Sequence, residues 1–219
     1  MTDITSPALN AHIDLDALER TPLQRDPYDF TIVENFIHPD ALKAVIADFP
    51  KVPGPGSHPP SVLDIHGHFG ALMDEMMGDD FRHAVARKFG VDLEGRPAMY
   101  TVRGYVRDTD GSIHTDTKTK IITVLLYLNE GWDEGGGRLR ILRSGTDIEN
   151  YVAEVSPFAG TLLIFRRADN SWHGHLPFGG QRRAIQLNWV VSQDVVDKEQ
   201  RRHHISSTFK KIKHAILGA

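Results

Sequence analysis

The 219 residues suit one domain, or one core domain with a small annex. The composition, with 40% apolar and 25% charged residues, excludes a wholly disordered chain. The net charge of −4 argues against a nucleic-acid-binding protein. The absence of cysteine excludes disulfides, thiolate metal sites, iron–sulfur clusters and cysteine nucleophiles, so any metal ion must be held by His, Asp or Glu.

The first part of the chain is expected to be mainly helical. Residues 1–27 are polar and contain several prolines, so we expect a loosely attached arm, and Phe30–Ile37 alternates as a strand does. Pro39 suits the first turn of a helix. A loop rich in proline and glycine follows over Pro50–Pro60, and helical spacing resumes over Phe69–Phe89. The positions expected to be buried in this second helix are Leu72, Met76, Phe81, Val85 and Phe89.

Short β-rich segments follow one another from Met99 onward, separated by turn residues. Several short strands of this kind predict a sandwich or a barrel. Together with the helices before them, they indicate a jelly-roll core that is supported by N-terminal helices. The predicted strands are Tyr100–Val106, Ile121–Leu128 as the central one, Leu139–Leu142, Tyr151–Val155, Thr161–Phe165 and Ala184–Val191.

We therefore expect an α+β or mainly β fold with a double-stranded β-helix (jelly-roll) core. The predicted organisation is an N-terminal arm over 1–27, a helical support region over 28–98, the jelly-roll catalytic core over 99–193 and a C-terminal helix over 194–219. That helix is rich in Lys and Arg, and it is either a solvated surface or a face for a partner or an anionic substrate. Without an apolar run of membrane-spanning length or a signal-peptide pattern, we expect a cytoplasmic protein.

The motif His114-Thr115-Asp116 is the strongest chemical signal in the chain. Side chains on an extended strand repeat every two residues, so His114 and Asp116 are expected on one face, where they can bind one metal ion. The best third ligand is His173, in the sequence Asn170-Ser-Trp-His-Gly-His. Two histidines and one carboxylate leave three coordination positions open, as in the facial triad of non-haem iron(II) oxygenases.

Open positions of this kind suit a bidentate α-keto acid and O₂. A keto acid such as 2-oxoglutarate also has a distal carboxylate, which needs a buried cation. In the last predicted strand, one face is apolar, and it is formed by Ile185, Leu187 and Trp189. The other face has smaller and more polar side chains, namely Ala184, Gln186 and Asn188. By alternation, Arg182 belongs to this polar face and Arg183 does not. Arg182 is therefore the predicted cation, because its planar fork pairs with a carboxylate in two parallel hydrogen bonds.

In this order the motifs resemble the iron(II)- and 2-oxoglutarate-dependent dioxygenase superfamily, and most of all its prolyl-4-hydroxylase-like branch. The resemblance covers about Met99–Val191. Three further stretches carry it, namely Tyr127-Leu-Asn, Gly136-Gly-Arg-Leu-Arg-Ile and His173-Gly-His-Leu-Pro177.

The resemblance implies a hydroxylase that uses iron(II), 2-oxoglutarate and O₂, and that releases succinate and CO₂. The aspartate of the motif favours hydroxylation, because related halogenases have a small residue in its place. Tyr105 matches a family tyrosine less well than Tyr127 does, and Asn188 stands where the branch has an aromatic residue, so the substrate stays open. The implied site residues are the iron ligands His114, Asp116 and His173, and the cosubstrate-binding residues Arg182, Tyr127 and Tyr105.

Several of these residues have a second interpretation. His114 and Asp116 also fit a surface pair at a strand end, and His175 is an alternative to His173 as a ligand. The pair His66-Gly-His68 follows a proline-rich loop and suits a lid better than a metal site. Trp172 suits either packing under the metal or contact with the substrate. The residues that either line the pocket mouth or belong to solvated strand faces are Arg103, Arg107, Lys118, Arg138 and Arg140.

Two other functions compete with the hydroxylase. One is a metal-binding jelly roll without turnover, used for sensing or for sugar binding, and the other is a cupin-type metal enzyme that uses no keto acid. Neither needs a cation such as Arg182 after the distal histidine. We expect a small-molecule or peptidyl substrate, and neither nucleic acid nor a membrane as a partner.

Overall fold

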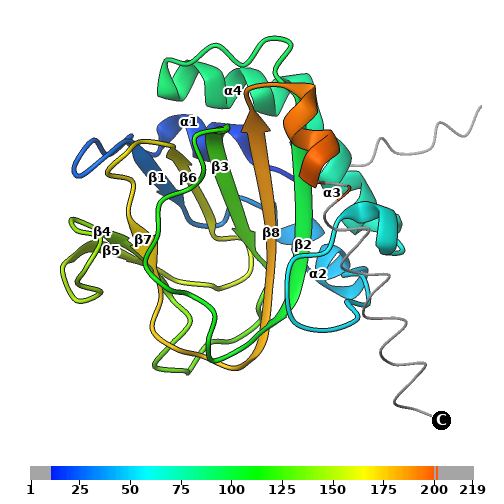
Figure 1. Ribbon diagram of the computed structural model, residues 1–219. Helices are drawn as coiled ribbons and strands as arrows, with labels where there is room; N and C mark the ends of the chain where they lie inside the picture. Colours follow the sequence, from blue (N-terminus) through cyan, green and yellow to red (C-terminus); the bar gives the residue numbers. More distant parts are fainter. Residues whose placement is uncertain (1–10, 200, 202–219) are drawn as a thin grey trace, which may run out of the picture.

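The computed structural model describes residues 11–199 and 201, and its fold is mainly antiparallel β with few helices. One sheet has five strands in the order β1-β6-β3-β8-β2, and a smaller sheet has three in the order β5-β4-β7. Figure 1 shows the smaller sheet beside the large one. The strands are β1 (Phe30–Val33), β2 (Ala98–Val106), β3 (Lys120–Tyr127), β4 (Leu139–Leu142), β5 (Tyr151–Val155), β6 (Leu162–Arg166), β7 (His173–Gly174) and β8 (Gly180–Val190).

The predicted strands are all present, with two differences. The strand predicted over Phe30–Ile37 ends at Val33, because Asn35 adopts a positive φ of 54° in a turn. The two-residue strand β7 was not predicted, since two residues are too short to show alternation. The central position predicted for the apolar strand Ile121–Leu128 is confirmed, because β3 lies between β6 and β8.

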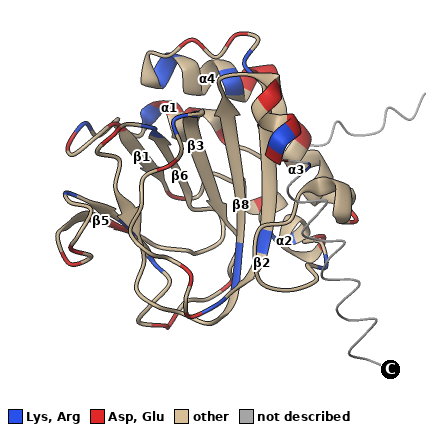
Figure 2. Ribbon diagram, in the orientation of Figure 1, with Lys and Arg blue, Asp and Glu red and all other residues tan. Residues whose placement is uncertain are grey.

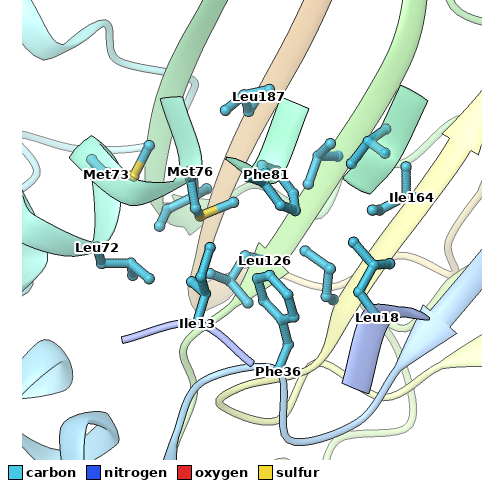
Figure 3. Packing of buried hydrophobic residues seen from close by; sticks show 14 of the residues in the cluster. Ile13, Leu18, Phe36, Leu72, Met73, Met76, Phe81, Leu126, Ile164 and Leu187 are labelled. Carbon is cyan, nitrogen blue, oxygen red and sulfur yellow. The ribbon is translucent and has the colours of Figure 1, made fainter. Parts of the chain in front are cut away.

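Helices cover one face of the large sheet (Figure 1). In Figure 3, Met76 and Phe81 of these helices pack against Leu126 and Leu187 of the sheet. Apolar burial of this kind removes side chains from water on both elements at once, which holds the helices on the sheet. The helices are α1 (Leu15–Arg20), α2 (Pro39–Ala47), the 3₁₀ helix η1 (Pro60–Val62), α3 (Gly67–Met77) and α4 (Asp79–Phe89).

The single helix expected over Phe69–Phe89 is two helices. Gly78 has an extended backbone, with φ −76° and ψ 168°, and it ends α3 and precedes α4. Asp79 and Asp80 then occupy the first turn of α4, where their charges are favourable beside the helix N-terminus. The five positions expected to be buried in this segment are all buried, so the prediction of its inner face is confirmed.

The N-terminal arm is not loosely attached over residues 11–27. The side chain of Asp14 accepts a hydrogen bond from the Ala17 N–H at 2.8 Å and caps α1. Before this cap, the backbone N–H of His12 donates to the carboxylate of Glu75 in α3. Within α1, Leu18 is fully buried. These contacts join residues far apart in the sequence, so they leave no local pattern.

Two faces of β8 differ as predicted. Ile185, Leu187 and Trp189 belong to the core under the helices. Arg182 lies on the other face of the strand, which looks toward the smaller sheet, whereas the guanidinium of Arg183 lies 5.1 Å from the ring of Phe49. The alternation of β8 therefore separates a packing face from a face that is available for a site.

The C-terminal helix is described only at its beginning, where residues 193–199 are helical. Most of the C-terminal helix predicted over 194–219 lies outside the described residues. Over residues 11–199 and 201, we find no helix with the length and apolar character that crossing a membrane requires.

Candidate metal and cosubstrate site

A cavity of about 210 Å³ is lined by strands of both sheets. It brings together four residues that were predicted from separate parts of the sequence, namely His114, Asp116, His173 and Arg182. In Figure 2, a short stretch near one end of β8 and a short stretch of β2 have the colour of Lys and Arg. β8 contains Arg182 and Arg183, and β2 contains Arg103. The cavity thus has a candidate metal centre in one part and cationic side chains in another.

The backbone brings the two histidines together. His114 and His173 form an isolated antiparallel bridge in which each N–H donates to the other carbonyl at 3.0 Å. The His-x-Asp motif is therefore extended, as expected, although only His114 has ladder hydrogen bonds and no regular strand forms there. One ligand atom from each of His114, Asp116 and His173 lies within 4.8 Å of the others, so the three residues can hold one metal ion.

The ring orientation of both histidines is set by backbone carbonyls. Nδ1 of His114 donates to the Ser112 carbonyl at 2.8 Å, and Nδ1 of His173 donates to the Ser171 carbonyl at 2.9 Å. Because Nδ1 is engaged by a carbonyl, Nε2 is the ring nitrogen that each histidine has left for a metal ion. Burial lowers the pKa of His173 to about 4, so this imidazole is neutral at neutral pH.

Both carboxylate oxygens of Asp116 accept hydrogen bonds. Thr123 Oγ1 donates to Oδ2 at 2.5 Å, and Lys120 Nζ donates to Oδ1 at 2.8 Å. Asn188 Nδ2 in turn donates to Thr123 Oγ1 at 2.9 Å. Burial opposes the charge of Asp116, but the ammonium group of Lys120 and these hydrogen bonds hold its pKa below the usual value. The carboxylate is thus ionised and oriented.

Lys120 and Thr123 are site residues that were not predicted from the sequence. Thr123 did leave a signal, because it is the polar interruption of the apolar run over Ile121–Leu128 and it is 1% exposed. A buried hydroxyl in a central strand needs a partner, which here is a carboxylate. Lys120 left no comparable signal, since a lysine before a strand is ordinary.

Arg182 is held rigidly where a carboxylate can reach it. The residue is 5% exposed; its Nε donates to the Gly137 carbonyl at 2.7 Å, and its Nη2 donates to Tyr127 Oη at 3.2 Å. Burial raises the pKa of Tyr127 despite the nearby guanidinium, so the phenol is neutral. Two of five guanidinium N–H groups make these bonds, which leaves others for a ligand in the cavity.

Tyr105 is not brought to the site. Its side chain is 42% exposed, and it does not line the cavity. A bulge in β2 shifts the register between Arg103 and Tyr105, and Arg103 lines the cavity instead. Arg103 donates to Ser57 Oγ at 3.0 Å and to Asp110 at 3.4 Å, and burial lowers its pKa. The cosubstrate role expected for Tyr105 is therefore withdrawn.

His66, His68 and His175 do not join the triad, and Trp172 does not line the cavity. His175 lines the cavity, and burial lowers its pKa, but its Nδ1 donates to the Leu176 carbonyl and it is not among the converging ligand atoms. His68 contacts His12 through ring nitrogens 3.1 Å apart, away from the cavity. Within residues 11–199 and 201, the triad is the one cluster of His, Asp or Glu that converges closely enough for a metal ion.

Residues 97–191 match the 2OG-Fe(II) oxygenase superfamily. This segment contains all three converging ligands and Arg182. It is a 2OG-Fe(II) oxygenase domain. Members of this family use iron(II), 2-oxoglutarate and O₂, so the expected class of enzyme and its cofactors are confirmed. No match was found among curated proteins.

Solved structures of prolyl hydroxylases have a similar fold. A prolyl 4-hydroxylase from Pseudomonas putida is 19% identical, with a TM-score of 0.50 over 81% of this chain and 93% of that one. A Trichoplax adhaerens prolyl hydroxylase, in complex with a peptide fragment of hypoxia inducible factor, is 18% identical, with a TM-score of 0.50 over 80% and 88%. A Phytophthora capsici prolyl 4-hydroxylase is 16% identical, with a TM-score of 0.52 over 89% and 72%. At these identities the likeness establishes the fold.

Proposed function

We propose that the protein hydroxylates a C–H bond of its substrate and couples this step to the decarboxylation of 2-oxoglutarate. One oxygen atom of O₂ enters the new hydroxyl group and the other enters succinate, while CO₂ leaves, so atoms and electrons balance. We also infer that the two sheets form a double-stranded β-helix. The observation that carries the proposal is the buried cation Arg182 in the same cavity as the converging ligands His114, Asp116 and His173.

Each residue has a separate task in this proposal. His114 and His173 bind iron through Nε2, and Asp116 binds it through one carboxylate oxygen. Iron supplies the redox chemistry and activates O₂ when it is bound. Arg182, with the neutral phenol of Tyr127, binds the distal carboxylate of 2-oxoglutarate and thereby aims the keto acid at the metal. The low exposure of this end of the cavity strengthens the ion pair.

The buried arginine also distinguishes this function from the alternatives. A buried cation is costly unless an anion or several acceptors compensate it. Gly137 and Tyr127 supply two neutral acceptors, and neither carries the compensating charge. A sensor or a cupin-type enzyme that takes no keto acid has no use for this charge, whereas a dicarboxylate supplies its partner.

The substrate in this proposal is a small molecule or a peptidyl group. The Trichoplax enzyme, which is solved with a peptide, supports the second class. We expect neither nucleic acid nor a membrane as a partner, and we expect a cytoplasmic location.

The test is the conversion of 2-oxoglutarate to succinate by the full chain with iron(II) and O₂, together with a manganese titration. We expect Asp116→Ala to lose both metal binding and succinate formation, because two histidines alone hold a divalent ion weakly. The matched control is Asp133→Ala, at an exposed acidic residue outside the cavity. Full metal binding and turnover in Asp116→Ala would exclude the proposed site.

A further inference from the structure

A second groove, of about 420 Å³, continues from the cavity of the metal-binding residues. The two spaces share Ser57, Thr101 and Gln186. The groove lies toward the end of β8 that carries Asn188, and Arg182 lies at the opposite end of the strand. The side of the metal site away from the expected 2-oxoglutarate carboxylate is thus open to another molecule. Its apolar lining residues include Pro59, Pro60, Met77, Met99, Tyr100 and Val195.

Lys120 is placed at the junction of this groove and the metal site. It lines the groove, its side chain is 15% exposed, and its Nζ lies 2.8 Å from Asp116 Oδ1. Lys120 and Glu199 are the charged residues among those that line the groove in the described part of the chain. Lys120 is therefore the cation nearest to where a substrate in the groove would meet the metal.

The two donors to Asp116 differ in how firmly they are held. Thr123 is fully buried and is itself fixed by Asn188, so its hydrogen bond to Oδ2 is rigid. Lys120 reaches Oδ1 through a flexible four-carbon stem. A divalent ion on Asp116 repels an ammonium group beside the same carboxylate, and the flexible donor is the one that gives way. The ammonium group then lies in the groove that its stem already lines.

We propose that Lys120 is the anion-binding residue of the substrate site, and that the substrate is a small amphiphilic carboxylic acid. This inference rests on the proposed function, because it needs a divalent ion at Asp116. An ammonium group displaced into a groove with largely apolar walls is costly without a partner, and a carboxylate supplies one. The same walls suit the hydrocarbon part of the molecule, whose C–H bonds then face the metal.

The charges of the loaded site point to the same class. The divalent ion and Arg182 balance Asp116 and the dianion of 2-oxoglutarate. Arg103 is paired with Asp110 at 3.4 Å. The groove has one other charged lining residue in the described part of the chain, Glu199, so this count covers the metal end alone. At that end Lys120 is the cation that faces the substrate, and a carboxylate is the group that complements it.

The first part of the test measures manganese affinity by titration calorimetry. We expect Lys120→Met to bind manganese more tightly than the wild type, because a competing cation is removed. If Lys120 instead served only to hold Asp116, the affinity would fall, and that result would overturn the inference. Lys118→Met is the matched control, since Lys118 is exposed and lines neither space. Lys120→Arg keeps the charge and guards against a folding defect in the methionine variant.

The second part uses hexanoate and hexanamide as probes of the protein loaded with manganese and 2-oxoglutarate. Paramagnetic relaxation of the probe protons by manganese reports both affinity and closeness to the metal. We expect hexanoate to bind at least about tenfold more tightly than hexanamide, as a charged hydrogen bond predicts. That preference should disappear in Lys120→Met and persist in Lys120→Arg and Lys118→Met.

The two levels of failure are separable. If the wild type binds manganese and 2-oxoglutarate but hexanoate shows no preference over hexanamide, or neither probe relaxes, the assignment of Lys120 is wrong and the proposed function stands. If manganese and 2-oxoglutarate do not bind together, the proposed function itself fails.

Discussion

Replacing Arg182 by methionine tests the link between the buried cation and 2-oxoglutarate. Methionine keeps an unbranched apolar side chain and removes the charge. Arg182 is 5% exposed, so bulk water cannot take over the role of the guanidinium. The Gly137 carbonyl, which accepts from Arg182 Nε at 2.7 Å, also loses its donor.

The expected magnitude follows from this burial. Removing one partner of a buried ion pair costs about 3–5 kcal/mol, which corresponds to a roughly 150-fold to 5,000-fold loss of affinity for 2-oxoglutarate. The unpaired carbonyl lowers the free energy of unfolding by about 1–3 kcal/mol. The affinity of Arg182→Lys for 2-oxoglutarate should lie between that of the wild type and that of Arg182→Met, because lysine restores the charge without the planar fork.

The assay is a calorimetric titration of 2-oxoglutarate into the manganese-loaded protein, with thermal unfolding measured in parallel. The matched control is Arg183→Met, since the neighbouring guanidinium lies near the ring of Phe49 on the opposite face of β8. Manganese affinity should be the same in all variants. An unchanged affinity for 2-oxoglutarate in Arg182→Met, or an equal loss in Arg183→Met, would refute the reasoning.

Three further variants test the frame around the site. Thr123→Val removes the hydroxyl that orients the metal-binding carboxylate, and we expect manganese affinity to fall by about 10- to 100-fold. The control is Thr31→Val, at an equally buried threonine that does not line the cavity, and it should leave manganese affinity unchanged. Gly137→Ala places a methyl group 2.7 Å from an indole ring at a φ of +75°, so the unfolding free energy should fall by about 1–3 kcal/mol, and Gly135→Ala, with nothing within 4 Å, should not change it. Leu126→Ala, at a fully buried position, should lower the urea midpoint by an amount equivalent to about 2–5 kcal/mol, and a loss below 1 kcal/mol would contradict the core described above.

Much of the site was predictable because its determinants are local or periodic. His114 and Asp116 are two residues apart, and an extended backbone places such residues on one face. Arg182 was distinguished from Arg183 by the alternation of β8, and the structure places the two on opposite faces, as expected. The central strand β3 was evident from its continuous apolar run.

Other features depend on contacts between distant parts of the chain and left no such pattern. The N-terminal segment is attached through the hydrogen bond between His12 and Glu75, which lie 63 residues apart in the sequence. Tyr105 was misplaced because a bulge in β2 changes the register, which residue spacing does not reveal.

The sequence by itself determined the class of chemistry, since the metal-ligand pattern, its order and the alternation around Arg182 are written along the chain. Only the tertiary structure decided which polar groups surround that chemistry. It placed Lys120 and Thr123 on Asp116, and Arg103 in the cavity in place of Tyr105. The physical reason is that ligand spacing follows from backbone geometry over a few residues. The partners of a buried charge, in contrast, are chosen by which strands and loops meet in space.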